Sequence, residues 1–358
     1  MPLRSIRHAL LRLLVMPGVP HALARLTNTR ATIFMLHRFS VPDLGISGHD
    51  PAALRHNLEY LRRARYNIIS VAELFERLSS RQPLERTIVF TVDDGYFDQA
   101  AIAAPIFADF DCPVTFFVAT GFLDRKIWFW WDRLAFIFEQ TKRRELCARV
   151  GTKLMKYRWD TSVGRRDAWW DLNLRCQDAS DRDRLGCIEE LSRAAEVEVP
   201  ARPPARFAPM SWDTARRLES NGASFGPHTV THPVLGTTSA AAAAWEIAES
   251  WHRVRAEVAH PVPVFCYPNG RSHDIGEREI AIVRRLGLAG GLMAHPGELN
   301  HEMCLQSESA ACRVPRFGYS DNLRQILQCV SGLENLKSRL RSSRGSAFRK
   351  METSRCRG

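Results

Sequence analysis

The sequence lacks any run of about 18 consecutive apolar residues, although 45% of its 358 residues are hydrophobic. A membrane-spanning helix needs about 20 such residues, so no spanning helix is predicted. Regular cysteine spacing is also missing, because the nine cysteines form no CxxC pair and are scattered along the chain. The sequence therefore predicts no disulfide framework, which favours a reducing compartment.

The body of the chain has no excess of positive charge, although the whole chain has a formal charge of +11. Residues 1–30 contribute five arginines and no acid, and residues 336–358 contribute eight Lys or Arg against Glu352 alone. These two ends leave the remainder with a charge of −1. A nucleic-acid groove needs Lys and Arg spread over a folded face, so no nucleic-acid partner is expected.

The basic ends suit contact with an anionic membrane surface. In residues 1–30, apolar residues at helical spacing predict a short amphipathic helix that lies on a membrane or packs on the domain. Ala22-Leu23-Ala24 resembles a cleavage site, but Arg12 interrupts the apolar run before it, so we expect no cleavage. We expect a cytoplasmic protein, peripheral at the inner membrane, with a solvated basic tail at 336–358.

From residue 30 onward, short β-branched runs alternate with segments of helical period. This alternation predicts an α/β fold, a parallel sheet or barrel built from repeated βα units. The expected strands are 32–39, 66–70, 87–92, 113–119, 223–226, 262–266, 288–293 and 313–317. The expected helices are 51–65, 71–78, 99–110, 211–220, 240–258, 277–286 and 321–340.

Residues from about 125 to 208 break the βα alternation. They hold six of the nine tryptophans, at positions 128, 130, 131, 159, 169 and 170. We predict a domain over residues 31–335 that contains this Trp-rich segment as a mainly helical insertion.

Polar residues follow two of the predicted strands. Asp93-Asp94-Gly95 comes directly after 87–92, although this triplet taken alone is more often a turn. His228 and His232 follow 223–226, in a segment whose prolines and β-branched residues favour a loop over a helix. The carboxyl ends of barrel strands meet at one face, and an Asp, His, His ligand set leaves a tetrahedral position open. The combination predicts a divalent-metal site, with Zn²⁺ as the expected ion.

Two further segments are weaker signals on their own. Phe265-Cys266-Tyr267-Pro268-Asn269-Gly270 also ends a predicted strand, but by itself it is only a turn. Arg313 and Arg316 offer guanidinium groups that could pair with a carboxylate or could be surface cations.

Together these segments resemble the successive motifs of the polysaccharide deacetylase family (NodB homology, carbohydrate esterase family four). The motifs are Thr91 to Tyr96, His228 to His232, Phe265 to Gly270 and the first-strand segment Met35 to Phe39. The similarity covers about residues 31–330 outside the insertion. It implies a distorted (β/α) barrel of about seven parallel strands. It also implies a hydrolase that removes an N-acetyl group from a sugar of a polysaccharide, an oligosaccharide or a lipid-linked glycan.

The resemblance assigns roles to the motif residues. Asp93 would be the catalytic base, and Asp94, His228 and His232 would bind the metal. A bound metal lowers the pKa of its water from 15.7 to about 7, and Asp93 would take the proton as that water attacks. The backbone N–H near Tyr96 would help to hold the oxyanion. The residues expected to contact substrate are Tyr96, Tyr267, Pro268 and Asn269.

The sequence departs from the family pattern where many relatives carry an arginine that orients the catalytic aspartate, because Cys266 stands there. Arg316 is expected to take that role, with Arg313 behind it. The general acid is expected to be His295, in the Leu292-Met293-Ala294-His295 segment, or His37 at the end of the first strand. The altered motif also permits an alternative, a catalytically inactive carbohydrate-binding protein of the same fold. The tryptophans of the insertion could line a sugar-binding rim or bury the insertion against the barrel.

Overall fold

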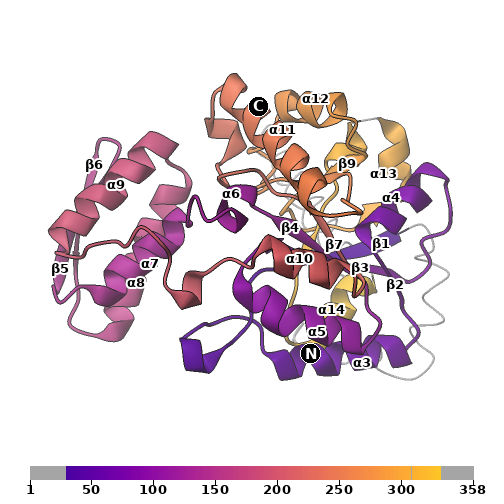
Figure 1. Cartoon of the computed structure of the whole chain (residues 1–358), viewed down its shortest axis with the longest axis horizontal. Coiled ribbons are helices and arrows are strands. Elements are labelled where there is room, and N and C mark those ends of the chain that lie inside the picture. The colour runs from indigo at the N-terminus through magenta and orange to yellow at the C-terminus, as the bar shows by residue number, and fades with distance from the viewer. Residues whose placement is uncertain (1–29, 308, 332–358) are drawn as a thin grey trace, which may run out of the picture.

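The computed structural model describes residues 30–307 and 309–331 (Figure 1). The predicted N-terminal helix and basic tail lie outside these residues. The strands of the main domain are β1 (Arg30–Leu36), β2 (Asn67–Ile69), β3 (Thr87–Asp94), β4 (Val114–Val118), β7 (Ala223–Pro227), β8 (Val264–Cys266), β9 (Gly290–Leu292), β10 (Leu299–Asn300) and β11 (Phe317–Gly318). Its helices are α3 (Pro51–Arg63), α4 (Val71–Ser79), α5 (Ala104–Asp109), α6 (Thr120–Leu123), α10 (Trp212–Glu219), α11 (Ala240–Glu257), α12 (Glu277–Arg285), α13 (His301–Gln306) and α14 (Leu323–Val330).

Parallel neighbours follow one another around a closed ring. β1 pairs with β3, β3 with β4, and β4 with β7. The Val262 N–H donates to the Phe225 carbonyl between β7 and β8, and β8 pairs with β9. A parallel bridge from Leu292 to Val314 leads to β11, which pairs with β1 and closes the ring. The predicted (β/α) barrel is confirmed, with β10 added antiparallel at the edge of β1.

Burial explains the sequence of the central strands. All eight residues of β3 are buried, so it is a continuous run, TIVFTV, before its two aspartates. The flanking helices begin at polar caps, as at α4, where the Ser70 side chain accepts from the Glu73 N–H at 3.1 Å. The helix predicted over 99–110 starts instead as a π-helical turn, η2 (Gln99–Ala103), before α5.

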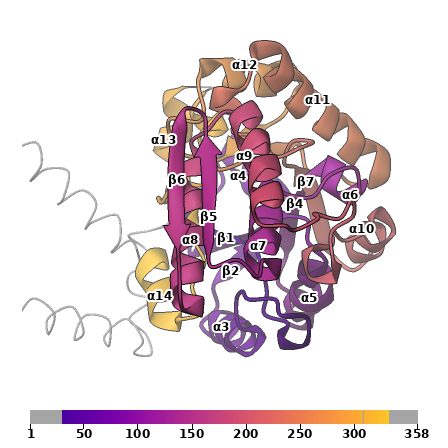
Figure 2. The same cartoon turned by 90° about the vertical axis from the view of Figure 1, so that its left-hand side faces the viewer.

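The Trp-rich insertion contains a separate lobe beside the barrel (Figures 1 and 2). Its elements are α7 (Trp130–Gln140), β5 (Glu145–Val150), β6 (Lys153–Arg158), α8 (Ser162–Gln177) and α9 (Asp181–Ala194). Buried side chains such as Leu134, Leu172 and Leu191 form its own core. The hairpin β5–β6 was not expected from the sequence. In β5, exposed and buried residues alternate, but charged residues on the exposed face of the hairpin hide this pattern in the sequence.

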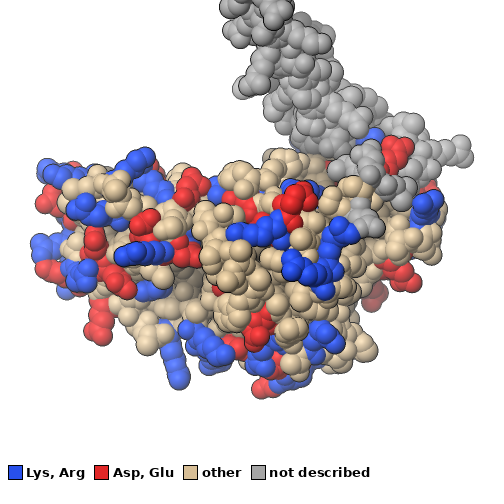
Figure 3. Space-filling model, turned by 90° about the horizontal axis from the view of Figure 1, so that it is seen from above, with Lys and Arg blue, Asp and Glu red and all other residues tan. Residues whose placement is uncertain are grey.

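The surface carries charged side chains of both signs. On the face shown in Figure 3, basic and acidic side chains are interspersed, as expected for a nearly neutral body. The cysteines among the described residues are all free. Within the same ranges, no helix has the length and apolar character needed to cross a membrane.

Candidate active site

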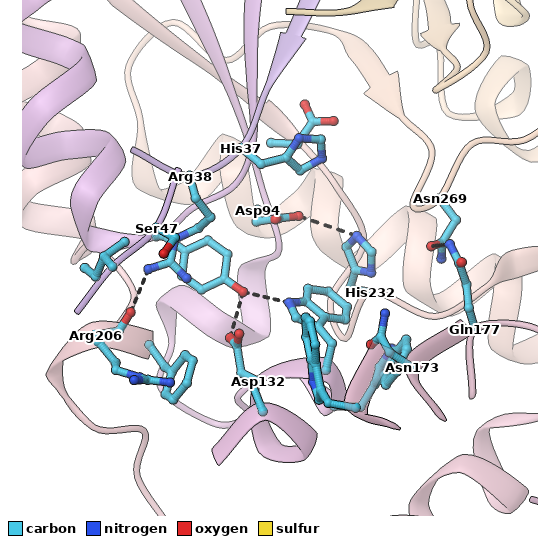
Figure 4. A pocket seen from close by; sticks show the side chains of 18 of the residues that line it. His37, Arg38, Ser47, Asp94, Asp132, Asn173, Gln177, Arg206, His232 and Asn269 are labelled. Atoms are coloured by element: carbon cyan, nitrogen blue, oxygen red, sulfur yellow. Dashed lines mark hydrogen bonds and ion pairs between the residues drawn. The ribbon is translucent and has the colours of Figure 1, made fainter. Parts of the chain in front are cut away.

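A pocket of about 600 Å³ lies where the strand ends of the barrel meet the insertion lobe (Figure 4). Asp93 and Asp94 line it from β3, and His228 and His232 line it from the loop after β7. Side chains from α7 and α8 line the pocket from the lobe. The volume is within the usual range for small-ligand sites.

The turn after β3 has a strained backbone that only a few residues permit. Asp94 has a φ of 89° and Gly95 a φ of 96°. The positive φ favours glycine at position 95, where a Cβ would also lie 2.4 Å from Leu123 Cδ1. The buried Gln99 side chain secures the turn, because its Oε1 accepts from the Gly95 N–H at 3.1 Å and its Nε2 donates to the carbonyls of Asp93 and His37.

Asp94, His228 and His232 converge as a possible metal-ligand set. The Oδ1 atom of Asp94 lies 3.6 Å from His228 Nε2 and 3.5 Å from His232 Nε2. Two ligand atoms around a tetrahedral zinc ion lie about 3.4 Å apart, so these spacings fit such an ion. The His228 Nδ1–H donates to the Cys266 carbonyl at 2.8 Å, which leaves Nε2 facing the set.

The histidine loop has a strained backbone that a buried acid holds in place. Thr229 and His232 have φ values of 66° and 59°, which are unusual for residues with a Cβ. Glu246 of α11 accepts from the N–H groups of Val230 and Thr231 at 2.7 and 2.9 Å. The loop is therefore fixed with both imidazoles directed at Asp94, and strain of this kind clusters at functional sites.

The protonation states of the three residues suit a cation. Burial lowers the pKa of His228 to about 4 and that of His232 well below its usual value, so both imidazoles are neutral at pH 7. Burial and the charge of Asp93 raise the pKa of Asp94 well above its usual value. A bound cation would stabilise the ionised carboxylate, so the set fits a divalent ion that prefers N and O ligands.

Asp93 is held by the arginine that the sequence predicted. Arg316 Nη1 and Nη2 donate to the two carboxylate oxygens of Asp93 at 2.8 and 2.7 Å, and both side chains are almost fully buried. Burial alone would raise the pKa of Asp93, but the Arg316 charge and hydrogen bonds outweigh it and hold the pKa well below its usual range. Arg313 instead contacts the Ile275 carbonyl and Glu277.

Cys266 lies beside this pair. Its Sγ is 3.1 Å from Arg316 Nη2 and 3.5 Å from Asp93 Oδ2. Asp93, His228 and Cys266 could also hold an ion by distance alone. Burial raises the pKa of the Cys266 thiol and so disfavours the thiolate, which is the form that binds metals. Arg316 already donates hydrogen bonds to both oxygens of Asp93. The set centred on Asp94 is therefore favoured.

The two general-acid candidates occupy different environments. His37 follows β1 and lines the pocket, and Figure 4 shows its ring beside Asp94. Burial lowers the pKa of His37, and the charge of Asp93 opposes that shift. His295 is exposed and is not among the residues that line the pocket. The geometry favours His37.

The residues predicted to contact substrate differ in their placement. Tyr96, Tyr267 and Asn269 line the pocket, whereas Pro268 is not among the lining residues. Tyr267 is buried, and its hydroxyl has no hydrogen-bond partner within the part of the chain that the structure describes. Asn269 has a φ of 56°, and its Oδ1 accepts from Gln177 of α8 at 3.0 Å.

Tyr96 joins the barrel to the insertion through Asp132, which the sequence did not identify, and through Trp131, one of the insertion tryptophans. Its hydroxyl donates to Asp132 Oδ2 at 2.7 Å and accepts from Trp131 Nε1 at 2.9 Å (Figure 4). The Arg38 guanidinium lies over the Tyr96 ring at 3.9 Å. Gln99 and Asp132 carry no local signal, because only the packing of distant segments brings them to the site.

Comparisons with known proteins agree with this arrangement. Residues 188–290 match the family model described as polysaccharide deacetylase, which confirms the resemblance. The fold is similar to that of the Streptococcus pyogenes deacetylase PplD in complex with acetate, at 17% identity and a TM-score of 0.55, over 85% of this chain and 99% of that chain. It is also similar to IcaB from Ammonifex degensii, at 14% identity and a TM-score of 0.50, over 85% of this chain and 98% of that chain. No curated protein matches the sequence.

We expect the purified chain to bind about one zinc ion, because Asp94 Oδ1 lies at a spacing from each histidine Nε2 that suits a tetrahedral ion. His232→Ala should lose zinc at micromolar chelator concentrations that leave the wild type loaded, as measured by elemental analysis after dialysis. His252→Ala, a histidine outside the pocket, is the control and should retain zinc. Equal zinc content in both variants would remove the proposed ligand set.

We expect Asp132 to destabilise the fold as pH rises, because burial raises its pKa to about 7 despite the hydrogen bond from Tyr96. The folded carboxyl retains its proton above the unfolded pKa, so stability is lost between about pH 4 and pH 7. The metal-free Asp132→Asn protein should match the wild type at pH 4 and exceed its free energy of unfolding by about 2–4 kcal/mol at pH 8. Urea unfolding measures this, with Asp160→Asn as the exposed control. A difference that does not change with pH would contradict the assignment.

Proposed function

We propose that this chain is a divalent-metal-dependent deacetylase that removes the N-acetyl group from a sugar of a glycan. The observation that carries the proposal is the convergence of Asp94, His228 and His232 beside an Asp93 carboxylate held by Arg316. The match to the polysaccharide deacetylase family supports a hydrolase. The pocket at the strand ends has room for a sugar substrate.

Asp94, His228 and His232 would hold the ion, with Zn²⁺ as the expected metal. When bound, the ion would polarise the acetyl carbonyl and lower the pKa of a water molecule. Asp93 would accept a proton from the attacking water through a carboxylate lone pair that Arg316 leaves free. Arg316 keeps Asp93 ionised and fixes the direction in which that lone pair points.

The remaining steps use the backbone after β3 and a histidine. The bridge between Tyr96 and Pro209 uses the Gly95 carbonyl and the Phe97 N–H, so the Tyr96 N–H lies outside its hydrogen bonds. That N–H would donate to the oxygen that becomes negative as the carbonyl is attacked. His37 would take up a proton from solvent and deliver it to the leaving nitrogen, which otherwise departs as a poor leaving group.

We propose that the substrate is a glycan precursor. It would be a polysaccharide, an oligosaccharide or a lipid-linked glycan. The basic residues of 1–30 and 336–358 support a peripheral position at the cytoplasmic side of the inner membrane, where a lipid-linked substrate would be present.

The zinc-loaded protein should release acetate from N-acetylated glycans, with a loss of about 42 Da per acetyl group replaced by hydrogen, as the hydrolysis requires. A chelator should abolish the release and added zinc should restore it.

Arg316→Lys should keep zinc but lower kcat by about 10²-fold or more, because lysine cannot hold both Asp93 oxygens. Mass spectrometry of the glycans and elemental analysis check both. A folded, zinc-loaded wild type without acetate release on any glycan would favour the inactive carbohydrate-binding alternative.

His37→Gln should lower kcat by about 10²–10⁴-fold while zinc content stays unchanged, because proton delivery to the leaving nitrogen would be lost. His295→Gln is the matched control, since His295 is exposed and lies outside the pocket lining. Acetate release under saturating substrate compares the two variants. The reverse order of their effects would identify His295 as the general acid.

A further inference from the structure

One face of α8 forms a wall of the pocket. Trp169, Asn173 and Gln177 line the pocket at four-residue intervals, and Trp170 and Leu174 lie one position further along. Residues four apart share a helix face, so the five form a continuous stripe, which we call the α8 wall. None of the five side chains carries a charge.

The α8 wall and the residues near it hold buried polar atoms whose hydrogen bonds are not made. Trp169 Nε1 and Asn173 Oδ1 have no partner among the described residues, and the same holds for Trp130 Nε1 and Asn269 Nδ2, which also belong to pocket-lining residues. A buried polar group without a partner destabilises the fold. A ligand that offers both donors and acceptors, as sugar hydroxyls do, would satisfy this set.

Apolar surface lies next to these polar atoms. Trp170 is 53% exposed and Leu174 is 44% exposed, although both are large and apolar. A pyranose ring has an apolar C–H face and a rim of hydroxyls, so it matches an exposed indole beside unpaired amide and indole groups.

The charges around the pocket favour an uncharged ligand. The pocket-lining arginines that the structure describes are Arg38 and Arg206, and each forms an ion pair, with Asp98 and Glu139 respectively. An anionic sugar would therefore find no unpaired cation among these lining residues.

The α8 wall is held in a fixed position relative to the metal-ligand set. Gln177 Nε2 donates to Asn269 Oδ1 at 3.0 Å, and Asp178 at the end of α8 pairs with Arg271 at 2.8 Å. In the view of Figure 4, Asn173, Gln177 and Asn269 lie beyond His232 as seen from Asp94. A ligand on the wall would thus extend away from the reacting acetyl group.

We propose that the α8 wall is a subsite for an uncharged sugar ring linked to the N-acetylated sugar at the metal-ligand set. This inference rests on the proposed function and narrows it to neutral glycans of two or more sugars. The insertion lobe then selects the substrate, while the barrel carries the chemistry.

The test measures binding to the full-length, metal-free protein by isothermal titration calorimetry. The probes are N-acetylglucosamine, its β-1,4-linked tetramer and an acidic tetrasaccharide that alternates glucuronic acid with N-acetylglucosamine. The tetramer should bind about tenfold or more tightly than either other probe. Trp170→Ala and Asn173→Ala should each weaken tetramer binding by about tenfold and affect the monosaccharide less.

Two controls match these variants. Trp245→Ala removes an indole that is also 53% exposed but lies on α11 outside the pocket, and Val163→Ala alters α8 outside the pocket. Both should bind the tetramer as the wild type does. Absent tetramer binding, equal binding of monomer and tetramer, tighter binding of the acidic probe, or unchanged binding in both wall variants would each overturn the subsite.

The design separates this inference from the proposed function because binding is measured without turnover. Tetramer binding that depends on the wall, without acetate release after zinc is added, would support the subsite and reject the hydrolytic activity. Acetate release with the same kcat/KM for monomer and tetramer would support the activity and reject the subsite.

Discussion

The buried pair of Arg316 and Asp93 is the interaction on which the rest of the site depends. It joins β3 to the last segment of the barrel, and further hydrogen bonds from Arg316 to Thr91 Oγ1 and the Met293 carbonyl satisfy the guanidinium. Removing one partner from such a buried pair costs about 3–5 kcal/mol. The pair keeps Asp93 ionised, and burial together with that charge raises the pKa of Asp94. The closure of the barrel therefore affects the charge of both aspartates at the end of β3.

Tyr96 is one of the residues that connect the insertion lobe to the site. Tyr96 lies two residues after Asp94, and its hydroxyl contacts both Asp132 and Trp131 of α7. The Trp131 ring in turn lies 4.8 Å from the His232 ring. The turn that positions the carboxylates thus also positions the lobe, so substrate contacts on α8 are placed relative to the metal-ligand set. This coupling explains why a separately packed lobe can contribute to one pocket.

The tryptophans of the insertion divide between packing and the pocket. Trp128 and Trp159 are buried among hydrophobic side chains, as large aromatics usually are. Trp130, Trp131, Trp169 and Trp170 line the pocket. Both interpretations drawn from the sequence therefore describe part of the set, and composition could not separate them, because the division depends on which way each helix face turns.

The sequence alone determined the α/β class, the barrel strands and the positions of the motif residues, because hydrophobic period and turn chemistry are local properties. The resemblance to the deacetylase family followed from the same local motifs, and their proposed roles remain predictions. Tertiary structure decided which of Arg313 and Arg316 reaches Asp93 and which of His37 and His295 faces the pocket. It also brought Gln99, Asp132 and the α8 wall to the site. These choices depend on contacts between residues far apart in the chain, which no local pattern encodes. Arg316 and Asp93, for example, are 223 positions apart in the sequence.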